Sequence, residues 1–296
     1  METISSSTSL NLARQSFLGP RSDETLHKTE VAIVGLGGGG SHIAQQLAHL
    51  GVGNFLLLDA DRIEDTNLNR LVGGRASDVK RGLRKVFIAK RLIKAINPKS
   101  TVRAKPTNWQ EQTSLLQECD IAFGCIDSLI ARSEFEAFAR RCMVPLIDIG
   151  MDVHQINDEF VISGQVALSM PGLPCMRCMG ILNDQALKKE AEQYGKAGSR
   201  PQVIWPNGVL ASTAVGYFVQ LTTPWQRSQS PPLLMEYDGN TQTVTASSKV
   251  PYLPKICSHY AEMGNLGDPF WSPTSLRCSV PGFKPQFLTT SSGNRV

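Results

Sequence analysis

A glycine-rich turn followed by two acidic residues is the first pattern in this chain that could do chemistry. The apolar run 31–34 leads into Gly35, Gly37 and Gly40, which satisfy the pattern GxGxxG. Glycines let the backbone turn tightly beside a phosphate, and the first amides of a following helix point at the anion. Asp59 ends the next apolar run and could bind ribose hydroxyls. Taken alone, this pattern is weak evidence for a nucleotide.

The residues after Asp59 narrow the chemistry. A carboxylate that attacks the α-phosphate of ATP is already ionised and needs no general base. Catalysis then depends on positioning and on cations that offset the charge on the phosphates as pyrophosphate leaves. Such a site needs a glycine cradle, a ribose-binding acid, an Arg/Lys clamp and a carboxylate for magnesium. The chain contains residues of all four types.

Alternating strands and helices must position these residues. The pattern predicts strands at 31–35, 54–59, 101–104, 120–127 and 144–149, and helices at 41–50, 78–96 and 129–142. This alternation predicts an α/β fold with a doubly wound, mostly parallel sheet that holds ligands at the carboxyl ends of its strands. After Gly150 the pattern predicts an antiparallel C-terminal extension, made of a strand at 159–169, a helix at 208–221 and a hairpin at 233–237 and 241–247.

The expected organisation is one integrated domain. Residues 1–29 form an N-terminal arm, 30–150 the nucleotide-binding half, 151–279 the C-terminal half, and 280–296 a tail. The stretch 183–200 is polar and is either helical or mobile.

The run from Asp59 to Arg70, DADRIEDTNLNR, resembles the signature D-x-D-x-V-x-x-S-N-L-x-R of the ubiquitin-activating-enzyme superfamily. Its bacterial members include adenylyltransferases of the ThiF/MoeB type, which have a Rossmann-like fold. Together with the glycine loop, Arg14-Gln15 and Ile126-Asp127, the resemblance covers roughly residues 12–220. It implies a homodimer that uses Mg-ATP to turn the C-terminal glycine of a ubiquitin-like or sulfur-carrier protein into an acyl-adenylate.

The resemblance also implies a role for each candidate residue. Asp59 would bind the ribose, Asn67 and Arg70 would meet the phosphates, Lys85 would contact them too, Asp127 would hold magnesium, and Arg14 would reach into the partner subunit's site. Gly35, Gly37, Gly38, Gly40 and Asp61 complete the expected nucleotide site. The alternatives are a plain strand end for Asp59, a solvated helix face for Lys85, and contacts within its own subunit for Arg14. The chain departs from the family pattern at Leu71, where Gln is usual. Lys85 also lies two residues farther from Arg70 than the corresponding lysine usually does in the family.

A zinc site is the second expectation. Seven cysteines with one Cys-x-x-Cys pair favour reduced thiols and a metal site over a disulfide framework. Cys175 and Cys178 have the spacing of half a structural zinc site. The family usually supplies a second Cys-x-x-Cys near the C-terminus, and this chain has Cys257-Ser258-His259 instead. The resemblance therefore implies a Cys₃His site of Cys175, Cys178, Cys257 and His259, with Cys278 as the alternative fourth ligand.

A thioester on this chain is not expected. Residues 179–206, where self-acylating relatives usually carry their nucleophile, contain no cysteine. Cys119, Cys125 and Cys142 lie in or beside apolar runs and are expected to be structural. The activated carboxyl would then pass to a separate conjugating enzyme or a sulfur donor.

Composition limits the other possibilities. A formal charge of +4 does not require a nucleic-acid or membrane partner, and neither is expected. The N-terminus lacks the pattern of a secretory signal and no apolar stretch approaches the length of a membrane span, so a cytoplasmic location is expected.

Three alternative functions remain. A relative could activate a small-molecule, peptide or tRNA-base carboxylate by the same chemistry. An NAD-dependent oxidoreductase would explain the glycine loop but not Asn67, Arg70 or Lys85. A non-catalytic scaffold would not need Asp59, Arg70 and Asp127.

Overall fold

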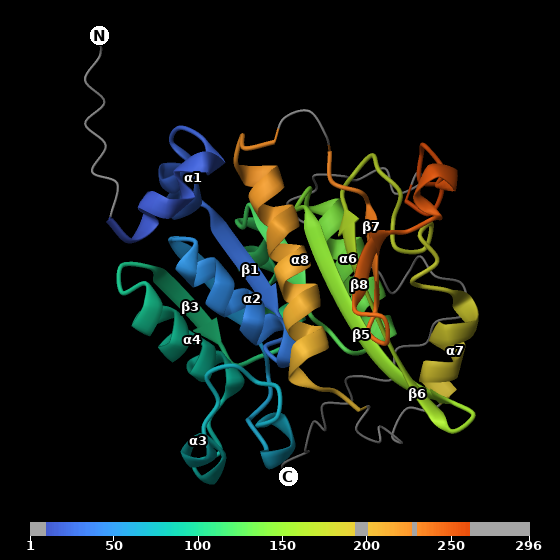
Figure 1. Ribbon diagram of the computed structural model, residues 1–296, viewed down its shortest axis with the longest axis horizontal. Helices are drawn as coiled ribbons and strands as arrows, with labels where there is room; N and C mark the ends of the chain where they lie inside the picture. Colours follow the sequence, from blue (N-terminus) through green and yellow to red (C-terminus); the bar gives the residue numbers. More distant parts are fainter. Residues whose placement is uncertain (1–9, 193–200, 227–229, 261–296) are drawn as a thin grey trace, which may run out of the picture.

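One continuous sheet organises the molecule. The computed structural model describes residues 10–192, 201–226 and 230–260. Within them, eight strands pair in the order β3-β2-β1-β4-β5-β6-β7-β8 (Figure 1). The parallel part contains β1 (Glu30–Val34), β2 (Asn54–Leu58), β3 (Thr101–Lys105), β4 (Ile121–Gly124) and β5 (Leu146–Ile156). The antiparallel part adds β6 (Glu159–Ser169), β7 (Leu234–Asp238) and β8 (Thr243–Ala246). The predicted fold class is confirmed.

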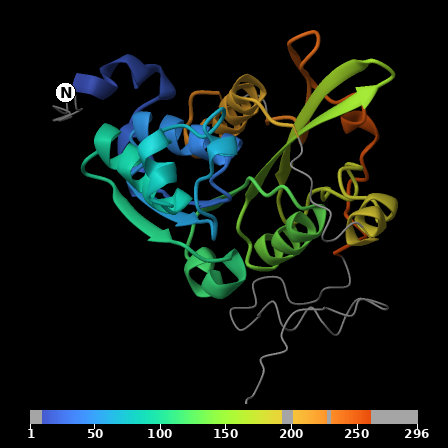
Figure 2. The same ribbon diagram turned by 90° about the horizontal axis from the view of Figure 1, so that it is seen from below.

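Helices cover both faces of the parallel part. On one face lie α2 (Gly38–His49), α4 (Lys85–Ile96) and α8 (Ile204–Thr222), and on the other lie α5 (Thr113–Gln117) and α6 (Leu129–Arg141) (Figure 2). The shorter elements are η1 (Leu10–Leu18), α1 (Ser22–Lys28), η2 (Asp65–Asn67), α3 (Ala76–Lys80), η3 (Trp109–Gln112), α7 (Asp184–Glu192) and η4 (Val250–Tyr252).

Alternating strand residues build two hydrophobic cores. In β1, Val31 and Ile33 pack in the core beneath α2 and α8, whereas Ala32 and Val34 pack in the core beneath α6. Parallel strands covered on both faces contain continuous apolar runs for this reason. On the α6 side, Trp109 lies 5.1 Å from Phe135, ring centre to ring centre.

The predicted elements differ from the structure at several places. The strand expected at 144–149 continues to Ile156 as β5, through the point where the sequence pattern changes. The helix expected at 78–96 is two helices, because Gly82, with a φ of 56°, interrupts the chain between α3 and α4. The helix expected from Gly208 begins at Ile204, because Pro206 lies in its first turn, where a missing N–H costs nothing. The N-terminal arm is helical in η1 and α1, and its residues Leu18 and Leu26 are buried.

The strand order determines where a ligand of this sheet is expected to bind. The chain leaves β1 toward β2 on one side, and β4 pairs with β1 on the other, so the order reverses between β1 and β4. Ligands of open α/β sheets bind at such a reversal, at the carboxyl ends of the strands. Gly35 directly follows β1, Asp59 directly follows β2, and Asp127 lies three residues after β4.

Candidate functional site

Two positions of the glycine loop have no space for a side chain, and a third has open space beside it. Gly35 has a φ of 89°, and a Cβ atom there would lie 2.3 Å from the carbonyl oxygen of Cys125. A Cβ atom on Gly40 would lie 1.9 Å from the carbonyl oxygen of Gly35. Gly37 precedes the first turn of α2 and would place a Cβ atom in open space. Because the N-terminal amides of α2 lack partners within the helix, this opening suits an anion such as a phosphate.

Asp59 fixes the glycine loop to the end of β2. One carboxylate oxygen accepts a hydrogen bond from the amide of Leu36 at 2.6 Å, and the other accepts one from the amide of Asp61 at 2.7 Å. Burial raises the pKa of Asp59, and the nearby charge of Lys85 opposes that rise. Each carboxylate oxygen retains a further lone pair, so the group could also accept a ribose hydroxyl.

Asp61 holds Lys85 at the edge of the site. The Lys85 Nζ lies 2.7 Å from Asp61 Oδ2, and the Lys85 amide donates to the Asp61 carbonyl oxygen at 3.1 Å. Only 11% of the Lys85 side chain is exposed. Lys85 is the first residue of α4 and is therefore set apart from the solvated lysines farther along that helix.

The loop with Asn67 and Arg70 is braced by its own side chains. Asn67 is buried, and its Oδ1 accepts a hydrogen bond from the amide of Glu64 at 3.1 Å. Arg70 uses Nη1 to donate to the carbonyl oxygen of Thr66 at 2.5 Å and to Asn69 Oδ1 at 3.0 Å. Among the described residues, its Nη2 and Nε have no such partner, so these donors could meet a phosphate.

Gln202 links this loop to Asp127, a connection that the sequence did not predict. Asn69 Nδ2 donates to the carbonyl oxygen of Gln202 at 2.9 Å, and Gln202 Nε2 lies 3.4 Å from Asp127 Oδ1. Asp127 is exposed, so its carboxylate is accessible to a cation. Gln202, two residues before α8, thus links the loop that contains Asn67 and Arg70 to Asp127, and no local pattern around Gln202 indicates this.

A buried ion pair lies beneath the same edge of the sheet and was also missed. Arg132 of α6 and Asp148 of β5 make two contacts, of which Nε to Oδ2 measures 3.2 Å. A Cβ atom on Gly124 would lie 2.9 Å from Asp148 Oδ2, and one on Gly150 would lie 2.9 Å from Arg132 Nη1. The only sequence signal was an acid within an apolar strand. The pair therefore fills the space next to the last residue of β4, three residues before Asp127.

The start of α8 packs against the start of α2. The Asn207 side chain lies against Gly38, where a Cβ atom would come within 2.7 Å of it. The His42 ring faces Gly208, and burial lowers the pKa of His42. His42 thus packs between the two helices.

Arg14 does not lie with the other candidates. In the 3₁₀ helix η1, Gln15 Nε2 donates to the carbonyl oxygen of Leu50 at 3.1 Å, at the C-terminal end of α2. The glycine loop lies at the opposite end of that 12-residue helix, about 18 Å away. Arg14 is exposed. The structure therefore does not bring it to the glycine loop of its own chain.

The four predicted zinc ligands converge in the antiparallel half. The Sγ atoms of Cys175 and Cys178 lie 3.7 Å apart, as do those of Cys178 and Cys257. His259 Nδ1 lies 3.4 Å from Cys178 Sγ and 3.5 Å from Cys175 Sγ. Zn–S bonds of about 2.3 Å in a tetrahedron separate sulfurs by about 3.8 Å, so this donor set fits zinc. The alternative ligand Cys278 lies outside the described residues.

Glu136 of α6 holds both loops of this Cys₃His cluster and was not predicted. Its Oε1 accepts hydrogen bonds from the amide of Met176 at 2.7 Å and from Ser169 Oγ at 2.6 Å, and its Oε2 accepts one from Tyr260 OH at 3.3 Å. The Arg140 guanidinium lies 4.9 Å from the centre of the Tyr260 ring. Met176 follows Cys175 in sequence and Tyr260 follows His259, so these hydrogen bonds tie both ligand-bearing segments to α6.

The other described cysteines have the character of core residues. Burial raises the pKa of Cys119 to about 12 and the pKa of Cys125 well above its usual value. A protonated thiol is a poor nucleophile, and these environments do not activate one.

Comparison with known proteins identifies the family. The sequence profile of the ThiF family matches residues 8–257. Molybdopterin-synthase adenylyltransferase of Escherichia coli is 34% identical over 163 residues, which are 54% of this chain and 61% of that protein. Sulfur carrier protein adenylyltransferase of Thermus thermophilus is 29% identical over 55% of this chain and 59% of that protein. The chain thus spans about three fifths of the length of these relatives.

Two further comparisons concern the alternatives and the fold. The tRNA threonylcarbamoyladenosine dehydratase of Bacillus subtilis is 41% identical, but over 96 residues that make up 32% of this chain and 37% of that protein. The crystal structure of E. coli MccB with ATP matches with a TM-score of 0.62 at 20% identity, over 80% of this chain and 71% of MccB. Among the described residues, no helix has the length and apolarity needed to cross a membrane.

Proposed function

The chain belongs to the ThiF family, and on that basis we propose that it is an ATP-dependent adenylyltransferase. Its substrate would be the C-terminal glycine carboxylate of a ubiquitin-like or sulfur-carrier protein. The observation that supports the proposal most is that the glycine loop, Asp59, the Asp61–Lys85 pair and Asp127 all follow or adjoin the carboxyl ends of neighbouring strands. The names of the E. coli and T. thermophilus relatives support the same reaction.

Each group has a part in the proposed reaction. A carboxylate oxygen attacks the α-phosphorus of ATP, the bond to the β-phosphate breaks, and pyrophosphate leaves with that electron pair. The backbone at Gly35, Gly37, Gly38 and Gly40, with Asp59, would hold the nucleotide. Lys85 and Arg70 would offset the growing negative charge, assisted by Asn67 within the same loop. Asp127 would hold Mg²⁺, which supplies further charge neutralisation when bound.

Asp61 is best explained as a positioning residue. Its carboxylate already binds Lys85 Nζ, and its own amide donates to Asp59. It would therefore fix the ribose-binding acid relative to the phosphate-binding lysine rather than contact the nucleotide.

The Cys₃His cluster would bind zinc as a structural metal. All four tetrahedral positions would be filled by protein, which leaves none for a substrate. Zinc would then join the loop after β6 to the segment after β8, away from the glycine loop.

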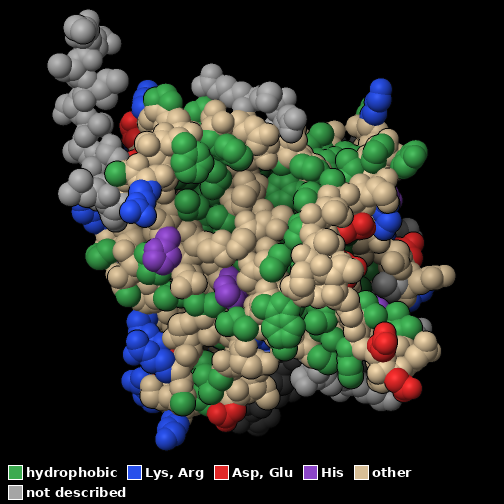
Figure 3. All heavy atoms as spheres, in the orientation of Figure 1, with side chains coloured by type: hydrophobic (Ala, Val, Ile, Leu, Met, Phe, Trp, Pro, Cys, Tyr) green, Lys and Arg blue, Asp and Glu red, His purple; other side chains and the backbone are tan. Residues whose placement is uncertain are grey.

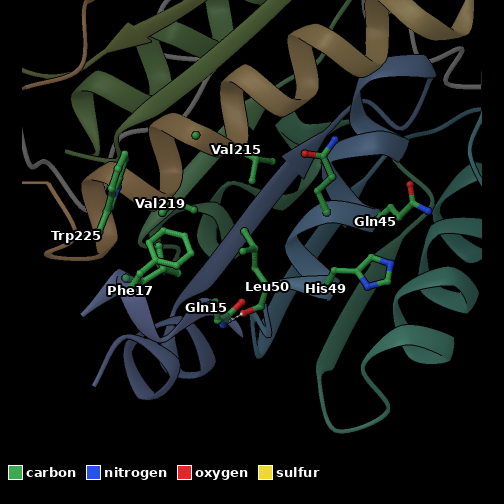
Figure 4. A pocket seen from close by; sticks show the side chains of 11 residues that line it. Gln15, Phe17, Gln45, His49, Leu50, Val215, Val219 and Trp225 are labelled. Atoms are coloured by element: carbon green, nitrogen blue, oxygen red, sulfur yellow. Dashed lines mark hydrogen bonds between the residues drawn. The ribbon is translucent and has the colours of Figure 1, made fainter. Parts of the chain in front are cut away.

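Arg14 requires a second subunit to act in catalysis. The adjacent helices α2 and α8 contain no Asp, Glu, Lys or Arg. Beside them lies an open cavity of about 780 Å³ whose lining includes Phe17, Leu50, Val219 and Trp225 (Figure 4). Phe17 and Trp225 meet edge to face and are 69% and 44% exposed. Depletion of charge and exposed aromatic residues are typical of protein interfaces, so this surface is the proposed homodimer contact.

A mixing experiment tests the action of Arg14 across that contact. Arg14→Ala and Asp127→Ala subunits would each be inactive as homodimers. In a mixed dimer, the Arg14→Ala subunit keeps Asp127 and receives Arg14 from its partner, so activity should return on mixing. If activity stays absent although mixed dimers form, Arg14 acts within its own subunit or not at all.

Pyrophosphate exchange tests the reaction itself. The purified chain, with Mg-ATP and a panel of small carrier proteins that end in Gly-Gly, should exchange labelled pyrophosphate into ATP with at least one carrier. Arg70→Ala and Asp127→Ala should each reduce the exchange by about 100-fold or more, as expected for lost charge stabilisation. Lys249→Ala, on the surface of the antiparallel half, is the matched control. Exchange that neither site variant reduces would refute the site assignment, and no exchange with any carrier would refute the substrate class.

Activation of a tRNA base, peptide or small molecule is the second candidate. The B. subtilis relative supports the tRNA variant, although its match covers a third of this chain. Intact-mass analysis of a carrier after reaction distinguishes the two, because only the first proposal adds AMP to a protein C-terminus. In either case the acyl group would pass to a separate conjugating enzyme, sulfur donor or acceptor.

A further inference from the structure

The modest net charge of the chain conceals a strong asymmetry. Residues 79–105 contain ten of the 30 Lys and Arg and none of the 26 Asp and Glu. This stretch therefore carries a formal charge of +10, and the rest of the chain, with 20 basic and 26 acidic residues, carries −6. Such a concentration of one type of charge in one stretch is typical of a surface that binds a partner of opposite charge.

Four of these cations already pair with acids. Lys85 pairs with Asp61, Arg81 and Arg91 pair with Asp78, and Arg103 pairs with Glu30 and Glu118. The other six have no acidic partner among the described residues, and together they define the basic face: Lys80, Arg84, Lys90, Lys94, Lys99 and Lys105. They come from the end of α3, the N-cap and body of α4, the loop before β3, and the last residue of β3.

Four of the six residues of the basic face are directed to solvent, and Arg84 and Lys105 are half-buried. Lys80, Lys90, Lys94 and Lys99 are exposed, whereas Val86, Ile88 and Ile93 on the other sides of α4 are buried. Figure 3 shows Lys and Arg side chains gathered at this side of the molecule, over α3 and α4. Because the structure holds these charges together without acids between them, they favour a polyanion.

We propose that the basic face binds the phosphate backbone of a nucleic acid. Lysine is depleted at the centres of protein interfaces, where aromatic residues are enriched. Here lysine dominates, and Phe87, 41% exposed, is the one large apolar side chain exposed on α3 or α4. Contacts from lysine to phosphate supply sequence-independent binding, and an exposed aromatic ring beside them can stack on an unpaired base.

A membrane surface fits this face less well. Helices that lie in a bilayer interface bury their apolar side in lipid. The apolar side of α4 is already packed against α2 and the sheet, where Val86, Ala89 and Ile93 belong to the core. Only the charged side remains available, which suits phosphates in solution.

This binding is independent of the proposed adenylation. Lys85, the residue of the same stretch assigned to the phosphates of ATP, faces Asp61 and is not part of the basic face. Failure of one proposal therefore leaves the other intact, provided that the test does not rely on catalysis.

The proposal is tested by fluorescence anisotropy. The probes are labelled 20-mers of single-stranded RNA, double-stranded RNA and double-stranded DNA, and the affinity of the chain for each is measured over a range of salt concentrations. The test variant is Lys80→Ala/Lys90→Ala/Lys99→Ala. The control is Lys28→Ala/Lys249→Ala/Lys255→Ala, which removes the same charge from exposed lysines elsewhere. Circular dichroism of both variants verifies the fold.

The full chain should bind at least one of the three probes at low salt. The test variant should bind about tenfold or more weakly, and the slope of log K against log salt should become shallower by about 2–3. The control should match the unaltered chain. A DNA or RNA preference identifies the type of nucleic acid. Absence of binding, equal losses in both variants, or the same lysine dependence only with anionic vesicles or polyglutamate would overturn the proposal.

Discussion

The candidate nucleotide site and the Cys₃His cluster are built in opposite ways. At the carboxyl edge of the sheet, the side chains of Asp59, Asn67 and Arg70 bond mainly to nearby backbone, and Asp59 and Arg70 retain further acceptors and donors for a ligand. In the antiparallel half, four ligand atoms lie within 4.8 Å of one another. A ligand that must enter and leave requires the first arrangement, and a resident metal suits the second.

Helix α6 joins the two regions. It begins just after Asp127, with Ser128 as its N-cap, and its middle and end supply Glu136 and Arg140 to the support of the cluster. Arg132 lies between them and pairs with Asp148 of the sheet. Variants in the two regions should therefore differ in what they lose, and variants in α6 should show whether the regions depend on each other.

The largest effect is expected in the glycine loop. Gly40→Ala would place a Cβ atom 1.9 Å from the carbonyl oxygen of Gly35, so backbone must move. We expect the free energy of unfolding to fall by about 4 kcal/mol or more, measured by urea denaturation. Gly37→Ala, in the same loop but with open space around the added carbon, should cost less than about 1 kcal/mol. Equal losses in the two variants would contradict the described loop geometry.

Loss of the metal should have the next largest effect. The purified chain should contain one zinc ion by mass spectrometry, and Cys257→Ser or His259→Ala should lose it. Removal of zinc by a chelator should lower the free energy of unfolding by about 3 kcal/mol, because the metal binds the folded state preferentially. Cys119→Ser, remote from the cluster, should retain zinc. Full zinc content in both ligand variants would disprove the site.

Glu136→Gln tests the support from α6. The substitution keeps the shape but removes the charge that accepts from Met176, Ser169 and Tyr260. We expect a loss of about 2 kcal/mol and faster release of zinc to a chelator, followed by a colorimetric dye. Glu134→Gln on the same helix, which bonds only to Gln110 among the described residues, should change neither quantity. Unchanged zinc release in Glu136→Gln would show that the cluster does not depend on α6.

The smallest effect concerns pH. Asp78 is buried, and its hydrogen bonds to Arg91 hold its pKa below the usual value. A depressed carboxyl pKa adds stability above the unfolded pKa of about 3.9, and this stability disappears as the pH falls through the lower folded value. Asp78→Asn should therefore cost about 1 kcal/mol near pH 7, reduced by the partial exposure of Arg91. Thermal melts of the two proteins should converge at strongly acidic pH, and a constant difference down to that pH would contradict this account.

The sequence predicted those parts of the fold and site that depend on local patterns. Apolar runs gave the strands because a strand buried on both faces must be apolar, and Gly35 and Gly40 were recognisable because no other residue fits those turns. Cys175 and Cys178 were recognisable from their spacing. The family, the fold class and the convergence of the four metal ligands followed from the same signals.

Contacts between distant segments could not be predicted in this way. Nothing near Gln202 indicates that it links Asn69 to Asp127, and nothing near Glu136 indicates that it accepts from Tyr260. The break at Gly82 was missed because the apolar spacing continues through it.

By itself, the sequence determined which residues could bind a nucleotide and a metal, because residue type and local spacing fix the chemistry. Only the tertiary structure decided which of them meet. It joined Asp59, Asp61 and Lys85 by a hydrogen bond and an ion pair and left Arg14 at the far end of α2. It also sorted ten cations into four that pair with acids and six that have no acidic partner among the described residues, four of which are exposed. The physical reason is that hydrogen bonds and ion pairs depend on distance in space, which strand order and helix packing set and local sequence does not.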